Sequence, residues 1–428
     1  MRRDFDRSCE RNGGGVNCAG LTSHIAIVGA GAAGVAAAIF TRQLHPNSSV
    51  VVFDGARVIG AKILVSGGGR CNVTNASVTE ADFWGGRRTV IRRVLRGFPV
   101  DKTVAFFRDI GVPLHEEPGG KLFPDSNRAR DVLNALLREA ARVGVKIVSG
   151  AKVNDIARGK DGFQISISGS RIAAPRVVLA TGGRSLPKSG SDGTGLEIAR
   201  RLGHTIVPTT PALVPLLLDT GVDAVHKELS GVSHEAELTL WIDGAADTRL
   251  AGSLLWTHFG ISGPVTLNMS RHFLRHPGAR LTMNFLPGET FETVEDWWIS
   301  CARRNPQTLV STQLATRLPS SVAAAVLARV RIDGATTLAH FAREDRRKLS
   351  HALVTWPLRI TGDRGYTYAE VTAGGVSLDE IDPSTMESRV CPGLWLVGEI
   401  LDVDGRIGGF NFQWAWSSAY VAAGALGA

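Results

Sequence analysis

Three glycines at a fixed spacing, Gly29, Gly31 and Gly34, constrain the fold of this chain more than any other feature. They follow an apolar run, Ile25 to Val28, that predicts a buried strand, and they open an alanine-rich stretch that predicts a helix. In such a turn the second glycine lets the backbone approach a pyrophosphate, and the third lets the helix pack closely on the strand. A second strand is predicted at Val50 to Asp54, where the terminal acid can accept hydrogen bonds from ribose hydroxyls. We therefore expect a nucleotide-binding βαβ unit; the alternative is a glycine-rich turn and an ordinary surface aspartate.

A second glycine-rich stretch, KILVSGGGRCNVTN, runs from Lys62 to Asn75. Its successive glycine amides and polar side chains are suited to a phosphate or to the ring oxygens of a flavin. It is not a Walker A loop, because no Gly-Lys-Ser/Thr ends it. The alternative is a structural loop that needs glycine at positive φ. Cys71 within it has no nearby cysteine partner, so we expect a small buried residue and not a nucleophile.

Two later segments complete the pattern of a nucleotide site. The apolar run from Arg176 to Ala180 predicts a strand that ends in Thr181-Gly182-Gly183, where the chain can pass beneath a nucleotide; a simple strand-to-turn is the alternative. Near the C-terminus another apolar strand ends in Glu399, and Gly408 to Asn411 open the last helix. A carboxylate there can bind a ribityl chain, and a helix N-terminus can stabilise negative charge on a reduced flavin. This second half-site favours FAD over NAD.

Composition narrows the class of protein. The chain has 428 residues, of which 44% are hydrophobic, and its five cysteines include no CxxC pair, so we expect a globular cytoplasmic protein without a metal site. Its glycine-interrupted apolar stretches are too short for a membrane span. The net charge of +8 raises the question of nucleic acid, but the basic residues are scattered along the sequence and interrupted by acids. We therefore expect a small-molecule substrate and no nucleic acid, and the sequence leaves the oligomeric state open.

The organisation along the chain predicts four segments. Residues 1–22 are expected to form a disordered extension, because they combine mixed charge with a glycine-rich sequence. The βαβ unit opens a nucleotide-binding segment, 23–211, in which residues 87–150 have a largely helical pattern. Alternating β-like runs and then a helical stretch indicate an inserted domain at 212–364. The nucleotide-binding pattern returns at 365–428.

Several motifs together resemble the BaiN-like (aminoacetone-oxidase-like) family of FAD-binding oxidoreductases: SGGGRCNVTN, GGKLFPDSNRARDVLNAL, LATGG, THFGISGP, VTAGGVSLDEIDPSTMES and GEILDVDGRIGGFNFQWAWSSA. The resemblance implies an α/β fold, with a glutathione-reductase-type Rossmann-like FAD-binding domain and an inserted β-barrel plus helical domain. The residues that it and the motifs assign to FAD are Gly29, Gly31, Ala32, Ala33, Gly34, Asp54, Lys62, Ser66, Gly67, Gly68, Gly69, Arg70, Asn72, Val153, Thr181, Gly182, Gly183, Glu399, Asp402, Gly408, Gly409, Phe410 and Asn411.

The resemblance also implies flavin redox chemistry on a small organic substrate. We expect a reductase that takes hydride from NADH or NADPH, bound transiently because no second GxGxxG motif is present, and reduces a substrate such as an enone. Two alternatives stay open: an amine (aminoketone) oxidase that uses O₂, and a flavoprotein that binds or modifies RNA. His258, in the motif THFGISGP, is the candidate proton donor or acceptor; a histidine that only hydrogen-bonds its loop is the alternative.

Overall fold

The computed structural model describes residues 11–12, 15–16, 24–167, 170–221 and 225–427. The expectation of disorder for residues 1–22 therefore falls mostly outside the described residues. The chain forms two compact units, and the first is built from two segments, Met1–Thr210 and Glu370–Ala428. The second unit is Pro211–Ala369. No helix in the described ranges combines the length and apolar character needed to cross a membrane.

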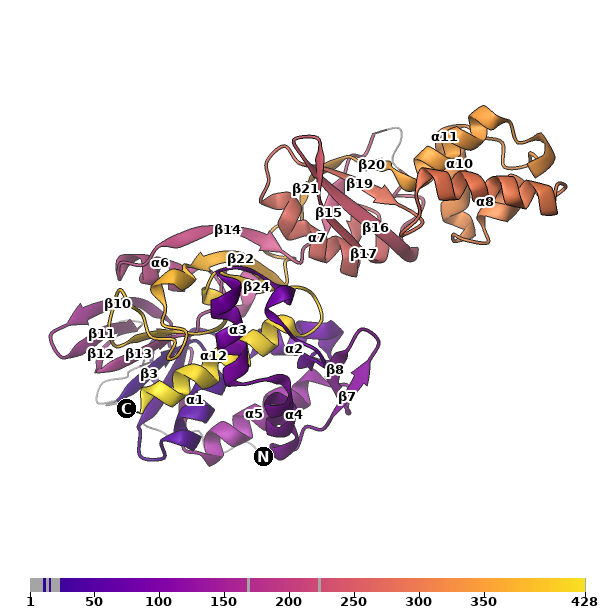
Figure 1. Ribbon diagram of the computed structural model, residues 1–428. Coiled ribbons are helices and arrows are strands. Elements are labelled where there is room, and N and C mark those ends of the chain that lie inside the picture. Colours follow the sequence, from indigo (N-terminus) through magenta and orange to yellow (C-terminus); the bar gives the residue numbers. More distant parts are fainter. Residues whose placement is uncertain (1–10, 13–14, 17–23, 168–169, 222–224, 428) are drawn as a thin grey trace. The chain divides into compact units, whose positions relative to one another are not determined.

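A five-stranded parallel sheet forms the centre of the first unit (Figure 1). Its strand order is β23-β13-β3-β4-β9. Nearly all residues of β23, β13, β3 and β4 are buried, as expected for strands covered on both faces, whereas the edge strand β9 is only partly buried. The bounds are β3 (Ile25–Val28), β4 (Val50–Asp54), β9 (Lys146–Ser149), β13 (Arg176–Leu179) and β23 (Leu394–Leu396). The nucleotide-binding βαβ unit expected from the glycine motif, and the Rossmann-like α/β fold, are confirmed.

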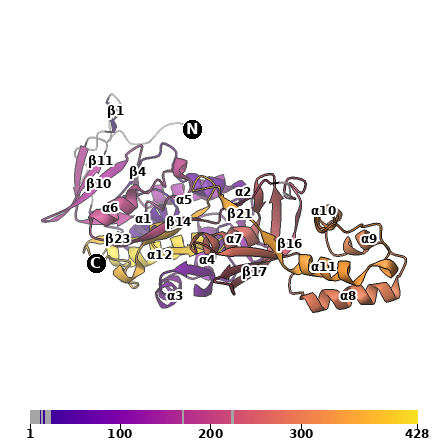
Figure 2. The same ribbon diagram turned by 90° about the horizontal axis from the view of Figure 1, so that it is seen from above.

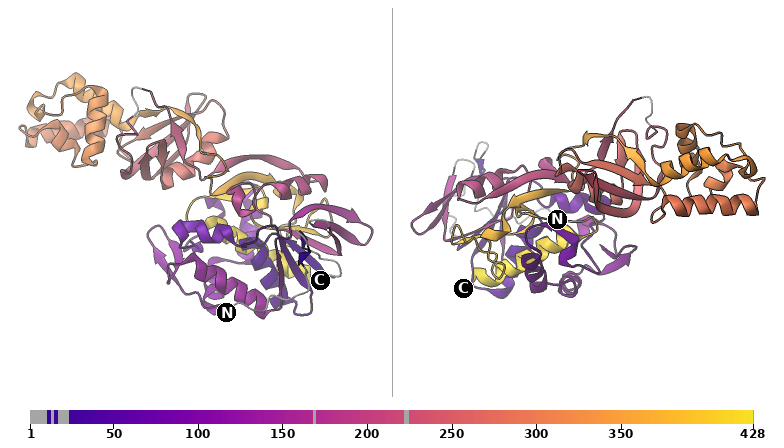
Figure 3. Two further views of the ribbon diagram at one scale, coloured as in Figure 1. Left: turned by 180° about the vertical axis from the view of Figure 1, so that it is seen from behind. Right: turned by 45° about the horizontal axis from the view of Figure 1, so that its top comes forward.

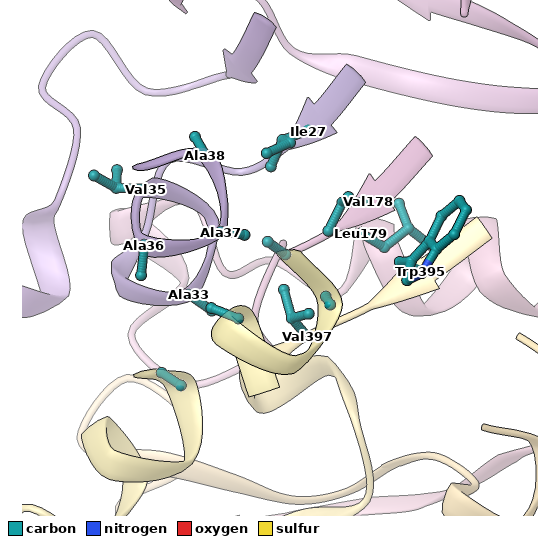
Figure 4. Packing of buried hydrophobic residues seen from close by; sticks show 14 of the residues in the cluster. Ile27, Ala33, Val35, Ala36, Ala37, Ala38, Val178, Leu179, Trp395 and Val397 are labelled. Carbon is teal, nitrogen blue, oxygen red and sulfur yellow. The ribbon is translucent and has the colours of Figure 1, made fainter. Parts of the chain in front are cut away.

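Two long helices from opposite ends of the first unit's sequence pack on each other. They are α1 (Ala32–Leu44), which follows the glycine motif, and α12 (Phe410–Leu426), which closes the chain. The alanines of α1 other than Ala32 are buried, and Figure 4 shows Ala33 and Ala37 on the side of the helix that faces Leu179 and Val397. Small side chains let the helix approach the sheet closely, so the N-terminus of α1 is fixed at the carboxyl ends of the parallel strands.

Smaller elements surround this core. An antiparallel three-stranded sheet is formed by β10 (Val153–Gly159), β11 (Gly162–Ile167) and β12 (Ser170–Ala174). Two-stranded pairs join β14 (Ile206–Ala212) to β22 (Val371–Val376) and β6 (Phe83–Gly85) to β24 (Val403–Gly405). The short helix α6 (Thr194–Arg201) and the helix α2 (Ala61–Gly69) complete this layer.

The stretch 87–150 is less helical than its pattern predicts. It contains α3 (Arg88–Gly97), α4 (Val100–Asp109) and α5 (Ala129–Arg142). Between α4 and α5 the chain forms an antiparallel hairpin of β7 (Leu114–Glu117) and β8 (Lys121–Pro124), to which β5 (Thr74–Asn75) adds a third strand. Four-residue strands of mixed polarity are too short to show a period of two, so the sequence pattern does not separate them from the helices around them.

The second unit contains a seven-stranded antiparallel sheet in the order β20-β19-β16-β17-β18-β15-β21. Its edge strands, β20 (Trp356–Leu358) and β21 (Ile360–Asp363), are separated in the chain by one residue, so the sheet curls until its two edges are close. The other strands are β15 (Leu216–Leu218), β16 (Ser233–Ile242), β17 (Ala245–Thr257), β18 (Gly260–Ser262) and β19 (Arg280–Asn284).

Helices account for the rest of this unit. α7 (Pro264–Leu274) packs on β16 and β17. The helices α8 (Phe291–Arg304), α9 (Val310–Leu314), α10 (Ser320–Val330) and α11 (Arg343–Val354) gather at one end of the unit, as Figures 2 and 3 show. The second unit therefore combines a curled sheet with a helical part.

Acid is expected to destabilise the second unit through His272, which is buried on α7. Burial, helped by the neighbouring Arg271, lowers the pKa of His272 from 6.5 to about 4. Because the unfolded chain binds this proton more readily, stability is lost as the pH falls from 6.5 towards 4, by up to about 3 kcal/mol. Urea unfolding across this range should show a smaller loss for His272→Gln than for the wild type. The control is His258→Gln, because His258 lies in the same unit and is exposed. If both variants lost the same unfolding free energy on acidification, the prediction would be contradicted.

Candidate functional site

Four segments from distant parts of the chain meet at the carboxyl edge of the parallel sheet. The amide of Gly29 donates to Phe53 O (2.8 Å), that of Ala180 donates to Val28 O (2.9 Å), and that of Val397 donates to Leu179 O (3.1 Å). These bonds extend the ladder beyond the strands, so the glycine turn, Thr181 and Gly398 lie side by side. Ligands of open α/β sheets bind at this edge.

The glycine turn is closely packed on one side and open on the other. A Cβ on Gly34 would lie 1.9 Å from Gly29 O, so the third glycine is required by the contact between helix and turn. Gly31 has an ordinary φ of −78°, and a Cβ there would meet no atom within 4 Å. The N-terminus of α1 therefore faces open space with no acid in its first turn, which is favourable for an anion such as a pyrophosphate.

Asp54 holds the glycine turn in place. Its carboxylate accepts hydrogen bonds from the amides of Ala30 (2.6 Å) and Ala56 (2.7 Å). Burial raises the pKa of Asp54, while these two hydrogen bonds oppose that shift. The sequence assigned this acid to a ribose hydroxyl, which stays a prediction; the structure shows that it bonds the backbone of the turn itself.

A polar cluster joins α2 to the end of β23. Lys62 Nζ donates to Glu399 Oε2 and to Ser185 Oγ, both at 2.7 Å. The other carboxylate oxygen, Glu399 Oε1, accepts from Ser185 Oγ (2.9 Å) and from the amide of Thr372 (3.0 Å). Lys62 and Glu399 are both mostly buried, with side-chain exposures of 24% and 18%. The sequence predicted the two charged residues separately, and it missed Ser185 and Thr372, which carry no motif of their own.

Removing one charge of this pair is expected to destabilise the first unit. In Lys62→Met the Glu399 carboxylate keeps its two hydrogen bonds but loses its counter-ion, and we expect the free energy of unfolding to fall by about 2 kcal/mol. Adding Glu399→Gln should restore most of that loss, because no unpaired charge remains. Urea unfolding of the wild type, both single variants and the double variant measures the coupling. Additive losses would show that the two groups act independently.

The second glycine-rich stretch begins as the helix α2 and breaks at Ser66, whose ψ is 147°. Gly67, Gly68 and Gly69 then follow with φ values of 55°, 68° and 84°, and Cys71 has a φ of 66°. The three glycines are exposed, and a Cβ on Gly68 would meet no atom within 4 Å. Burial raises the pKa of the Cys71 thiol to about 12, so the thiol stays protonated at neutral pH, as expected of a small buried residue.

The polar side chains of this loop point in different directions. Arg70 pairs with Glu117 (2.6 Å) and lies over the ring of Phe123, so the hairpin β7–β8 engages its guanidinium. Asn72 is buried, and its Oδ1 has no hydrogen-bond partner among the described residues. A buried acceptor without a donor is costly, so Asn72 is suited to receive an N–H or O–H group from a ligand.

A second group of predicted residues surrounds the start of α12. Gly409, its N-cap, packs against the backbone of Thr74, and Asn75 Nδ2 donates to Gly408 O (3.1 Å). The side-chain amide of Asn411 bonds both backbone groups of Gly405, at 2.8 and 2.9 Å. These contacts fix the N-terminus of α12 beside the loop that holds Asn72. Sequence reasoning missed the role of Asn75, which joins the second glycine-rich stretch to the start of α12.

The remaining predicted residues lie apart from these groups or inside the core. Phe410 is buried against Phe83, Val153 is buried at the start of β10, and Asp402 is buried beside Gly85. His258 lies in the second unit, in the turn between β17 and β18, where it is exposed and packs edge-on against Phe259. Its catalytic role stays a prediction.

The donor set fits a dinucleotide that carries a flavin. Open space at Gly31 in front of a helix N-terminus suits a pyrophosphate, carboxylates at two strand ends suit sugar and ribityl hydroxyls, and the unsatisfied Asn72 suits a hydrogen-bonding ring. Fold and site together define an FAD-dependent oxidoreductase of the Rossmann type. Residues 23–425 match the model of the family described as HI0933-like protein Rossmann domain, and the chain belongs to this family.

Two curated relatives match nearly the whole chain. The 3-dehydro-bile acid delta(4,6)-reductase of Clostridium scindens is 33% identical over 404 residues, which cover 94% of this chain and 98% of the relative. The ribosomal RNA dihydrouridine synthase of Escherichia coli is 33% identical over 399 residues, which cover 93% and 96%. Among solved structures, a quinol fumarate reductase of E. coli is similar over 94% of this chain and 69% of that chain, with a TM-score of 0.49 and 15% identity.

Proposed function

We propose that this protein reduces a carbon–carbon double bond conjugated to a carbonyl group, with NADH or NADPH as the electron donor. A small organic enone is the first candidate substrate. This reaction is more specific than the class to which the chain belongs, the FAD-dependent oxidoreductases.

The names of the two relatives support this reaction. A delta(4,6)-reductase of a 3-dehydro-bile acid acts on double bonds conjugated to a ketone. Dihydrouridine is uridine whose ring double bond, conjugated to the C4 carbonyl, has been reduced. The substrates differ in size and kind, but the bond that is reduced is the same in chemical type. This shared bond type is the observation that carries the proposal.

The chain's own residues supply binding and orientation for that reaction. In this proposal the N-terminus of α1 holds the pyrophosphate, Glu399 and Lys62 hold the ribityl region, and Asn72 with the start of α12 binds the ring edge. FAD, when bound, supplies the hydride chemistry, and the protein sets the geometry and the local charge. The start of α12 favours negative charge beside it, because helix α12 has 17 residues and no acid in its first turn.

The direct test follows the visible absorption of the purified holoprotein under anaerobic conditions. Addition of NADH or NADPH should bleach the flavin, and later addition of cyclohex-2-enone should restore the colour without oxygen. A protein that stays oxidised with both nicotinamides, but turns colourless with an amino ketone and forms peroxide in air, would be an oxidase. A protein that cannot be loaded with FAD would contradict the class itself.

His258 is the proposed proton donor to the reduced substrate. We expect His258→Ala to retain FAD and to lower the turnover rate by about a hundredfold, because a positioned proton donor contributes on this scale. His258→Gln, which keeps a hydrogen-bonding group but cannot carry the proton, should be as slow. Unchanged turnover in both variants would leave His258 with a structural role only.

A uracil base within RNA is the second candidate substrate. Uracil has the same conjugated double bond, and the relative from E. coli is named for a reaction on ribosomal RNA. The chain's net charge of +8 and its pI of about 9.5 are favourable for a polyanionic partner. The same bleaching assay, with single-stranded RNA in place of the enone, tests this candidate.

A further inference from the structure

An arginine side chain in the second unit is held between two aromatic rings. The guanidinium carbon of Arg364 lies over the ring of Tyr368, 3.4 Å from its centre, and over the ring of Phe259, 4.4 Å from its centre. At 3.4 Å the guanidinium must lie nearly parallel to the Tyr368 ring, because an N–H group that pointed at the ring would hold the carbon farther away. Such stacking fixes the orientation of the cation. We call these three residues the guanidinium clamp.

Backbone hydrogen bonds on both sides of the strand β15 fix the position of the clamp. Phe259 lies in the two-residue turn between β17 and β18, and its carbonyl accepts a hydrogen bond from the amide of Leu218 in β15 (3.1 Å). On the other side of β15, Arg364 directly follows β21, and its amide donates to Pro215 O (3.3 Å). The two side chains therefore start from neighbouring strands of one sheet.

The guanidinium of Arg364 is half-buried, and it has no carboxylate partner or hydrogen-bond acceptor among the residues that the structure describes. The adjacent acid, Asp363, accepts a hydrogen bond from a backbone amide (2.6 Å). By contrast, three other arginines that lie over rings, Arg70, Arg317 and Arg406, each pair with a carboxylate. Arginine stays charged at neutral pH, and half-buried donors are normally satisfied. Because the rings cover its faces, the N–H groups at the edge of the guanidinium are open to a ligand.

The candidate proton donor lies beside the clamp. The ring centres of His258 and Phe259 are 5.0 Å apart, with an angle of 80° between the ring planes. Phe259 thus contacts both the imidazole and the guanidinium. Along the chain, Tyr368 precedes by four residues Thr372, whose amide donates to Glu399 of the proposed flavin site (3.0 Å).

The proposed reaction needs a fixed positive charge at one atom of the substrate. Hydride addition to the β-carbon of an enone forms a C–H bond and moves the electron pair of the C=C bond onto the carbonyl oxygen, which becomes an enolate. A proton delivered to the α-carbon then forms the second C–H bond and restores the carbonyl group. A guanidinium that donates in its own plane to this oxygen stabilises the enolate more than the neutral ketone.

We propose that Arg364 is a catalytic residue that donates to the carbonyl oxygen of the substrate and stabilises the enolate. Phe259 and Tyr368 are positioning residues that hold the guanidinium, and His258 supplies the proton to the α-carbon. This inference rests on the proposed reaction and assigns the group that receives its negative charge.

A binding experiment tests the clamp without turnover. The probe is 4-nitrophenolate, a flat conjugated oxyanion that resembles the enolate, and equilibrium dialysis measures its affinity for the oxidised holoprotein. We expect Arg364→Met to bind the probe at least about tenfold more weakly than the wild type. Arg364→Lys, which keeps the charge but lacks the planar fork, should fall between them and carries the same comparison if Arg364→Met does not fold. The matched control is Arg347→Met, because Arg347 also lies over a ring of this unit, Phe291 at 4.9 Å, but is exposed; its affinity should equal that of the wild type.

Turnover of cyclohex-2-enone shows whether the oxygen bound by the clamp is the reacting one, because this substrate has no carboxylate. We expect kcat/KM to fall by about a hundredfold in Arg364→Met, as for the loss of one donor to a developing oxyanion. Tyr368→Leu removes one ring of the clamp and should lower kcat/KM by about tenfold, whereas Tyr368→Phe, which restores the ring, should recover the wild-type value.

The combined results separate this inference from the proposed reaction. Wild-type affinity for the probe together with wild-type enone turnover in Arg364→Met would overturn the clamp and leave the reaction standing. Lost affinity with unchanged enone turnover would place the clamp away from the reacting carbonyl and would overturn its catalytic role. Arg364-dependent binding of the probe, in a protein that no nicotinamide bleaches and that reduces no enone, would support the clamp as an oxyanion site and reject the reaction.

Discussion

Gly34→Ala is expected to produce an unstable protein that retains little or no FAD. The added Cβ would lie 1.9 Å from Gly29 O and 3.1 Å from the Cβ of Ala180. Both obstacles are fixed parts of the fold, one in the glycine turn and one at the end of β13, so the helix α1 must move as a whole. Because α1 packs on α12, that movement spreads into the other half of the unit. We expect the free energy of unfolding to fall by about 3 kcal/mol, as for other overpacked cores.

Thermal unfolding of the FAD-free protein measures this effect without involving the cofactor. Gly424→Ala is the matched control, because that glycine lies in the helix α12 and a Cβ there would meet no atom within 4 Å. The control should be neutral or slightly stabilising, since alanine favours a helix. A Gly34→Ala protein as stable as the control would mean that the contact between turn and helix is looser than the structure shows.

Gly31→Val is expected to separate cofactor binding from folding. Gly31 has an ordinary φ, and its side-chain direction is open, so the FAD-free variant should unfold at nearly the wild-type temperature. The two methyl groups would then fill the space in front of the N-terminus of α1. If the pyrophosphate lies there, as proposed, the affinity for FAD should fall by about a hundredfold or more, because the backbone can no longer approach the phosphates.

Fluorescence titration of the FAD-free protein with FAD measures that affinity. Gly31→Ala should have an intermediate effect, which makes the series graded by size. Wild-type affinity in Gly31→Val would place the pyrophosphate away from this helix and would contradict the proposed site. Unlike Gly34→Ala, a loss here cannot be attributed to a damaged fold if the thermal unfolding is unchanged.

The fold class could be predicted from the sequence because its main signals are local. The strands Ile25–Val28 and Val50–Asp54 are buried on both faces, so each is a continuous apolar run with the bounds that the structure has. The hairpin β7–β8 was not predicted, because its strands are short and contain charged residues. That hairpin determines the surroundings of Arg70, so the prediction for this residue lacked the partner Glu117.

The candidate site was harder to derive than the fold. The glycine motif and Glu399 have recognisable patterns, but Ser185 bonds Glu399 from 214 positions away and Thr372 bonds it from 27 positions away. Only the folded chain brings these residues together. Asn72 lies in a loop that the sequence already assigned to a phosphate or a flavin ring. Its lack of a hydrogen-bond partner could not be predicted, because that depends on the burial of its side chain in the folded chain. The grouping of Arg364 with Phe259 and Tyr368 could not be predicted either, because these side chains meet only after the sheet of the second unit is formed.

The pairing of β14 with β22 has a consequence for the architecture of the whole chain. These two strands flank the second unit in sequence, and they are hydrogen-bonded neighbours. The polypeptide thus leaves the flavin-binding core and re-enters it at adjacent points, so the intervening 159-residue stretch, Pro211–Ala369, behaves topologically as one very long hairpin loop. Replacing it with a short turn would leave every strand of the parallel sheet in its order, and loop-closure entropy favours the shorter connection. The second unit is therefore an inserted domain, which can be exchanged in evolution or engineering while the cofactor-binding core stays intact.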